Sequence, residues 1–149
     1  MVGGTALMPF VPAGEGLDRS FVDLDDLAAR MGDLPWRAML VGTVGLRVVL
    51  LRWPPGYGTV PHVHPNAEET FLVLDGRAIF AIGDEPEREV GRGAFMLAPR
   101  GVLHAIRVPE GAPVTLLASV APNEDRPDET IELAEPIEAA EPILRDDGA

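Results

Sequence analysis

The fold of this chain is decided by residues 56–76, which read GYGTVPHVHPNAEETFLVLDG, and by residues 93–104, which read GAFMLAPRGVLH. Together they hold all three histidines of the chain, His62, His64 and His104. Successive side chains of a strand point to opposite faces, so His62 and His64 project from one face and can bind one ion. Imidazole nitrogen and carboxylate oxygen suit iron, manganese, nickel, copper or zinc better than calcium or magnesium. We therefore predict a site of three histidines and one glutamate for a divalent transition-metal ion.

The two segments fit the patterns G(X)5HXH(X)4E(X)6G and G(X)5PXG(X)2H. In this they resemble the paired motifs of the cupin superfamily, and the strand-rich region around them extends the resemblance to residues 36–121. The resemblance implies an all-β fold, a small cupin-type β-barrel (double-stranded β-helix or jelly roll), with one metal ion on His62, His64, Glu69 and His104. The family's second motif often ends with Asn four residues after its histidine, where this chain has Val108.

Two adjacent carboxylates, Glu68 and Glu69, compete for the fourth ligand position. Six residues separate Glu69 from Gly76, as the first motif requires, and a shift of one residue in a strand would turn the carboxylate to the opposite face. We favour Glu69 as the ligand, with Glu68 as the alternative and otherwise a solvated loop charge. Glu69 is also a candidate catalytic base.

Composition excludes several other kinds of protein. The chain has 149 residues, 46% of them hydrophobic, which fits one domain with one core. It has no cysteine and no lysine, which excludes disulfides, thiolate sites and Schiff-base chemistry. A net charge of −12 without an arginine cluster argues against nucleic-acid binding. Arg47 and Arg52 interrupt the best apolar run and residues 1–12 lack the basic start of a signal peptide, so we expect a soluble, cytoplasmic protein with no membrane contact.

Along the chain, the periodicity divides the sequence into three parts. Residues 1–35 are expected to be an irregular arm followed by a short amphipathic helix from Ser20 to Met31, with Ser20 as its cap and Gly32 at its end. Residues 36–121 form the barrel, and residues 122–149 an extended, acidic, proline-rich tail. The expected barrel strands, with turns between them, are residues 36–41, 46–53, 69–74, 77–82, 87–90, 94–98, 104–108 and 114–120, with a short strand carrying His62 and His64.

Further details concern the connections and the pocket. The pair Asp75-Gly76 predicts a tight hairpin between residues 69–74 and 77–82. By the period of two, Ile106 and Val108 face the same interior as His104 and make the pocket apolar there. Arg47 and Arg52, five residues apart, face opposite sides of their strand. Tyr57, Arg100 and Trp53 flank the ligand segments; we favour surface or packing roles for each, with a place at the mouth of the pocket as the alternative.

The function expected first is that of an enzyme. Four protein ligands leave about two open positions on a six-coordinate ion, enough to bind a small chelating or anionic substrate. The resemblance implies a dioxygenase first, with isomerases, lyases and decarboxylases that do not use oxygen as the alternative. A non-catalytic module that binds or senses a small molecule is a third hypothesis. We also expect a homodimer, because the edge strands of small barrels are commonly covered by a second copy.

Overall fold

Strands make up most of the computed structural model, which describes residues 10–12 and 21–123. This confirms the all-β fold with one short helix. The arm was expected to be irregular, yet it contains a strand of three residues, too short for a periodic pattern. In chain order the described elements are β1 (Phe10–Pro12), α2 (Leu24–Met31), β2 (Trp36–Gly42), β3 (Arg47–Trp53), β4 (Glu68–Asp75), β5 (Arg77–Ile82), β6 (Arg88–Gly91), β7 (Phe95–Ala98), β8 (His104–Arg107) and β9 (Val114–Ala121).

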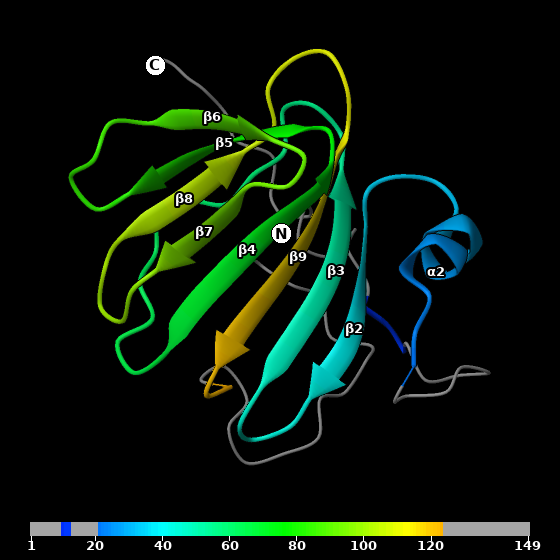
Figure 1. Ribbon diagram of the computed structural model, residues 1–149, viewed down its shortest axis with the longest axis horizontal. Helices are drawn as coiled ribbons and strands as arrows, with labels where there is room; N and C mark the ends of the chain where they lie inside the picture. Colours follow the sequence, from blue (N-terminus) through cyan, green and yellow to red (C-terminus); the bar gives the residue numbers. More distant parts are fainter. Residues whose placement is uncertain (1–9, 13–20, 124–149) are drawn as a thin grey trace, which may run out of the picture.

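The described strands form two sheets that face each other (Figure 1). The larger has the order β1-β2-β3-β9-β4-β7, and the smaller has the order β6-β5-β8. β1 pairs in parallel with β2, whereas the other neighbours in both sheets are antiparallel. Neighbours in space are thus often distant in sequence, as β9 between β3 and β4 shows.

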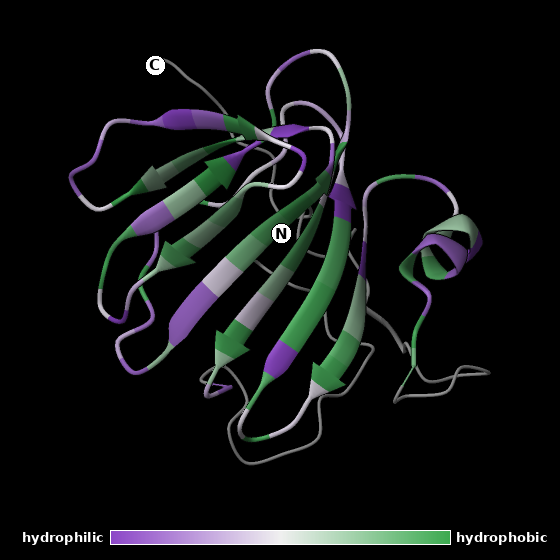
Figure 2. Ribbon diagram, in the orientation of Figure 1, coloured by the Kyte–Doolittle hydropathy of each residue, from purple (hydrophilic) through white to green (hydrophobic). Residues whose placement is uncertain are grey.

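The main core lies between the two sheets. Alternate residues of β3, namely Val49, Leu51 and Trp53, face inward into this core, as the period of two of a strand requires. Phe71 of β4 and Phe80 of β5 come from different sheets, and their ring centroids are 5.1 Å apart. The contact between these rings packs the two sheets together. Figure 2 shows that the strands of both sheets contain many hydrophobic residues.

The helix α2 covers part of the outer face of the larger sheet. Its Leu27 is buried with Trp36, Ala38 and Leu50 in a second apolar cluster that contains residues of β2 and β3. An amphipathic helix buries one stripe in this way and leaves its polar face in solvent. The helix has eight residues and, in the part of the chain that the structure describes, no helix is long and apolar enough to cross a membrane.

The predicted start of the helix was wrong. The helix begins at Leu24, and Asp23 is its N-cap, with its carboxylate accepting a 3.0 Å hydrogen bond from the Asp26 backbone N–H. Ser20 lies outside the described residues, and Phe21, expected on the apolar face, is 80% exposed. The periodic pattern extends back to Phe21, but an Asp at position 23 satisfies the free N–H groups of the first turn.

The chain does not form the hairpin predicted at Asp75-Gly76. β4 belongs to the larger sheet and pairs with β7 and β9, whereas β5 belongs to the smaller sheet and pairs with β6 and β8. Asp75-Gly76 therefore carries the chain from one sheet to the other. Gly76 has the positive φ of 83° that the turn signal implied, so the local conformation was predicted correctly and the pairing was not.

Candidate metal centre

Four side chains from separate parts of the chain converge inside the barrel. His62, His64, Glu69 and His104 each offer one ligand atom, and these four atoms all lie within 4.8 Å of one another. Glu69 belongs to β4 of the larger sheet and His104 to β8 of the smaller one, while the other two histidines come from the connection before β4. The structure thus brings together all four residues that the sequence singled out.

Backbone hydrogen bonds place His62 opposite His104. The His62 N–H donates to the His104 carbonyl at 3.0 Å, and the His104 N–H donates to the His62 carbonyl at 2.9 Å. Residues that exchange both bonds across an antiparallel pair present their side chains on the same face. The two ring centroids are accordingly 4.4 Å apart.

The connection around His62 and His64 is not the short strand that we predicted. Of the two histidines, His62 takes part in an isolated bridge with His104, and His64 lies outside any strand. Pro61 and Pro65 flank the pair and lack the N–H groups that a strand ladder requires. The alternation nevertheless persists locally, because Val63 between the histidines is 43% exposed.

The structure distinguishes between the two adjacent glutamates. Glu69 is buried, and its Oε1 lies 3.0 Å from His64 Nε2 and 3.1 Å from His104 Nε2. Glu68 is exposed at the start of β4. Because side chains alternate along a strand, only one of the two can face the barrel interior. Glu69 is the one beside the histidines.

The donor set fits a transition-metal ion. His62 Nδ1 lies 2.8 Å from the Val60 carbonyl, and His104 Nδ1 lies 3.0 Å from the Val102 carbonyl. A carbonyl only accepts, so each Nδ1 carries a proton, and in a neutral ring Nε2 then presents a lone pair. His104 Nε2 lies 3.1 Å from Glu69 Oε1, so these two atoms can share a proton in the metal-free chain and a metal ion in its place. A cation shared by both is the arrangement that stabilises them, and backbone carbonyls that orient ligand rings are common at metal sites.

The ionisation of the cluster also favours metal binding. Burial lowers the pKa of His62 below its ordinary value of 6.5, which keeps the ring neutral near neutral pH. Burial by itself raises the pKa of Glu69, but hydrogen bonds from His104 and His64, together with their charge, lower this pKa to about 2. Neutral imidazole and ionised carboxylate are the forms that coordinate metals.

The surroundings of the cluster are largely apolar. Ile106 and Val108 are buried in the main core, as expected, and the ring centroid of Phe71 lies 6.0 Å from that of His104. Of the three residues that flank the ligand segments, Trp53 is 2% exposed within the core, so it has the packing role that we favoured and does not line the mouth. Tyr57 is half-buried against the same core. Arg100, the third candidate, is exposed in the turn after β7.

The two arginines of β3 do face opposite sides, and the structure shows which one faces inward. Arg47 aligns with Val120 of β9, which also aligns with Glu69, so these three side chains share the inner face of the larger sheet. Arg52 lies on the outer face, where its Nη1 donates to Thr115 Oγ1 at 3.1 Å. The alternation of side chains along a strand shows only that Arg47 and Arg52 face opposite sides. Which of them faces the interior depends on the strands that flank β3, and the sequence does not show these.

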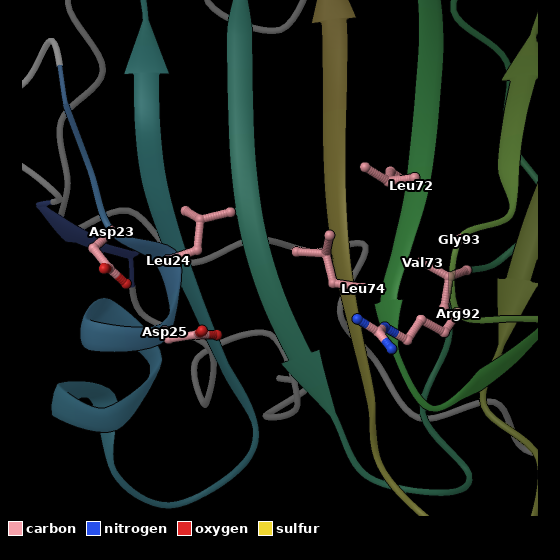
Figure 3. Close-up of a pocket in the computed structure, with 8 residues that line it drawn as sticks. All are labelled: Asp23, Leu24, Asp25, Leu72, Val73, Leu74, Arg92 and Gly93. Atoms are coloured by element: carbon pink, nitrogen blue, oxygen red, sulfur yellow. The ribbon is translucent and has the colours of Figure 1, made fainter.

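A separate pocket of about 400 Å³ lies outside the barrel and contains none of the four candidate ligands. It lies between the start of α2 and the end of β4, where Leu24 and Leu74 point toward each other (Figure 3). Its polar residues are Asp23 and Asp25 on one side and Arg92 on the other. The candidate metal centre is thus distinct from this outer surface.

Comparisons with known proteins agree with this geometry. The family model described as Cupin domain matches residues 49–120, a range that includes all four candidate ligands. Germin-like protein subfamily 2 member 3 from Arabidopsis thaliana is 30% identical over 83 residues, which cover 53% of this chain and 38% of that protein. The chain therefore spans less than half the length of this relative.

Solved structures show the same architecture. A protein with a double-stranded β-helix domain from Klebsiella pneumoniae is 24% identical, with a TM-score of 0.59 over 69% of this chain and 90% of that chain. The DMSP lyase DddQ from Ruegeria pomeroyi is 28% identical, with a TM-score of 0.52 over 62% of this chain and 49% of that chain. The facing sheets described above are therefore the double-stranded β-helix that the sequence motifs implied.

Proposed function

Because the chain belongs to the cupin superfamily, we propose that it is a mononuclear-metal enzyme that acts on a small chelating or anionic organic molecule. The observation that carries this proposal is the convergence of four ligand atoms within 4.8 Å of one another. Three neutral imidazoles and one carboxylate offset only one charge of a divalent ion. The remaining positive charge attracts an enolate, catecholate or carboxylate despite the acidic composition of the chain.

Each residue of the cluster has a definite part in this proposal. His62, His64, Glu69 and His104 hold the ion, which when bound supplies Lewis-acid or redox chemistry to the substrate. Val60 and Val102 orient two of the rings through their carbonyls. The apolar core beside the rings excludes water, which strengthens electrostatic interactions within the pocket.

We favour an oxygen-dependent, dioxygenase-like reaction, because the pocket offers few groups that move protons. All three histidines of the chain belong to the ligand cluster, and the chain has no lysine. The remaining candidate bases are Glu69 itself, by leaving the ion, and Tyr57. A reaction that depends on the ion and on dioxygen needs fewer proton-transferring side chains than the alternatives do.

A second candidate reaction is a lyase reaction that uses the ion only as a Lewis acid. The similarity to a solved structure named as a DMSP lyase, at 28% identity, favours this alternative. In this version Glu69 or Tyr57 removes a proton while the substrate is held at the ion. The substrate is then expected to carry a carbonyl or carboxylate beside an acidic C–H bond.

The proposal is tested on protein purified without chelators. Elemental analysis should find about one transition-metal ion per chain, and alanine variants of His62, His64 and His104 should each lose it. Oxygen uptake is then measured with catechols, diketones and flavonols, and product formation is followed with and without oxygen. Turnover that needs oxygen supports the dioxygenase, and turnover without it supports the lyase.

Two outcomes of the same experiment contradict the enzymatic proposal. If the parent protein binds no metal, or if the three variants keep it, the ligand assignment is wrong. If the metal-loaded protein binds members of the panel without converting any of them, the chain is a binding or sensing module. Parent protein treated with a chelator is the control that separates metal-dependent binding from non-specific association.

A further inference from the structure

One apolar side chain lies directly beside a candidate metal ligand, on the inner face of the smaller sheet. Ile82 of β5 aligns with His104 of β8, and Figure 1 shows the end of β5 beside the start of β8. Residues that are directly opposite in antiparallel strands point to the same side of the sheet. The ring of His104 is directed toward Glu69, so Ile82 also faces the interior, at the level of the metal centre.

The backbone hydrogen bonds of His104 show how close these two side chains are. Its N–H and its carbonyl are both bonded to His62, on the side of β8 that faces away from β5. His104 and Ile82 therefore form a non-hydrogen-bonded pair, in which the Cα atoms are about 4.5 Å apart and the side chains approach most closely. His62, His104 and Ile82 thus form one row on the inner face, with His104 in the middle.

Solvent reaches both ends of this row but not the next row of the same sheet. His62 and Ile82 are half-buried, whereas His104 between them is 3% exposed. In the next row Phe80 and Ile106 are aligned, and each of them is 3% exposed. The pairing of β6 with β5 ends at Phe80, which leaves the flank of Ile82 uncovered by that strand. Ile82 therefore offers accessible apolar surface next to the metal centre, and the core is closed behind it.

We propose that Ile82 is a specificity-determining residue, which contacts an apolar group of the substrate while the oxygen donors of the substrate lie at the metal centre. This inference rests on the proposed function and narrows its substrate class. The substrate is a small chelating molecule with a compact apolar group, branched or aromatic, directly beside its oxygen donors. Burial of that group against Ile82 favours it over a molecule with a methyl group in the same place. The buried side chains of Phe80 and Ile106 limit the depth of the contact, which disfavours a long chain.

The test measures the binding of two chelating probes and does not depend on turnover. Zinc-loaded protein is titrated with acetohydroxamate and benzohydroxamate, which share their donor oxygens and differ in the apolar group, by isothermal titration calorimetry. The ratio of the two dissociation constants is compared between proteins, so the intrinsic difference of the probes in affinity for zinc cancels. Ile82→Ala should lower the preference for benzohydroxamate roughly fourfold or more, the effect of one buried methylene, while keeping the zinc and the affinity for acetohydroxamate. Ile82→Val should lower it less.

Ile79→Ala is the matched control, because Ile79 lies on the same strand but on the outer face, where it aligns with Arg107. This variant should keep the ratio of the parent protein. The inference is overturned if Ile82→Ala also keeps that ratio, or if Ile79→Ala changes it equally. A parent protein that binds no zinc overturns the proposed function as well. A zinc-loaded parent that binds neither probe, or whose ratio is unchanged in Ile82→Ala, overturns this inference alone.

Discussion

Glu69 is the residue at which the parts of the candidate metal centre meet. Its Oε1 is within 3.1 Å of a ring nitrogen from His64 and of another from His104. Its carboxylate is ionised at any pH near neutrality, since its pKa is lowered to about 2. The single negative charge of the cluster therefore lies on this side chain, and its neighbour in sequence, Glu68, is exposed. Substituting Glu69 and Glu68 one at a time therefore compares the loss of a candidate metal ligand with the loss of a surface charge.

Glu69→Gln should bind metal much more weakly than the parent protein. Glutamine has nearly the same shape but no charge, and loss of a direct ligand should exceed the roughly 10- to 100-fold weakening that follows loss of an outer-shell partner. Metal affinity is measured by competition with a chromophoric chelator. Glu68→Gln is the control and should bind like the parent. Equal weakening in both variants would contradict the assignment of Glu69.

His62 should make the stability of the metal-free protein depend on pH. Its pKa in the folded chain is lowered from 6.5, mainly by burial, so below pH 6.5 the unfolded chain takes up a proton that the folded chain does not. The free energy of unfolding should therefore fall as the pH decreases through 6.5. Urea denaturation of chelator-treated protein between pH 7.5 and 5.5 measures this slope.

In His62→Gln this slope should be smaller, because the titrating ring is gone. The two proteins are compared by their slopes, so any constant loss of stability in the variant does not affect the result. If the slopes are the same, the pKa of His62 does not differ between the folded and unfolded chains.

At the scale of elements, the turn between β4 and β5 has the backbone conformation that the sequence predicted, but the two strands that it connects do not pair with each other. Gly76 has a positive φ, and a Cβ at this position would be 2.2 Å from the Pro113 carbonyl oxygen. The residue is thus required both for the backbone conformation and for the close approach of the segment before β9. The turn links the two sheets, so a change in its backbone conformation would displace strands that carry the metal centre.

Gly76→Ala should be far more destabilising than Gly93→Ala. Both glycines have positive φ, but a Cβ at Gly93 meets nothing within 4 Å. Gly93→Ala should therefore cost roughly 1–2 kcal/mol for the backbone alone. Gly76→Ala adds a collision with the backbone and should cost about 4 kcal/mol or more. The free energies of unfolding in urea test this, and similar losses in the two variants would show that the close contact is absent.

At the scale of the whole molecule, a metal ion at the candidate centre would join the two sheets. Glu69 contributes from the larger sheet, His104 from the smaller one, and the bridge at His62 attaches the intervening connection. A ligand that binds only the folded chain stabilises it in proportion to the logarithm of its concentration. Metal content and global stability are therefore coupled.

Loading the protein with metal at about a hundred times its dissociation constant should raise Tm by on the order of 10 °C, since this corresponds to about 2.7 kcal/mol. His104→Ala should show no such rise, because it lacks one of the four ligands. Differential scanning calorimetry with and without metal is the measurement. An equal rise in the variant would mean that the ion binds elsewhere.

The homodimer stays a prediction, and the described surface offers a place for it. Phe95 and Leu97 of β7, the edge strand of the larger sheet, are 65% and 46% exposed. Sheet edges that bear exposed apolar residues are commonly covered by a partner, and we expect a second copy of this chain here. Because the net charge of −12 opposes association, salt should promote the dimer.

Sedimentation equilibrium at low and high salt tests the dimer. A variant with both Phe95→Ser and Leu97→Ser should be monomeric, whereas Val44→Ser, which changes another exposed apolar residue in the β2–β3 connection, should not alter the mass. A monomeric parent at every salt concentration would contradict the prediction.

The sequence by itself determined the all-β class, the approximate strands, the glycine turns and the four residues of the candidate metal centre. The class, strands and turns follow from local conformational preferences, whereas the four residues follow from the resemblance of the two segments to the cupin motifs, whose spacing to Gly76 chose Glu69 over Glu68. Only the tertiary structure decided that Asp75-Gly76 crosses between sheets, that Arg47 and not Arg52 faces the interior, and that Trp53 belongs to the core. Each of these depends on which distant strands lie side by side, and strand pairing is set by the packing of the whole barrel, which no local pattern contains.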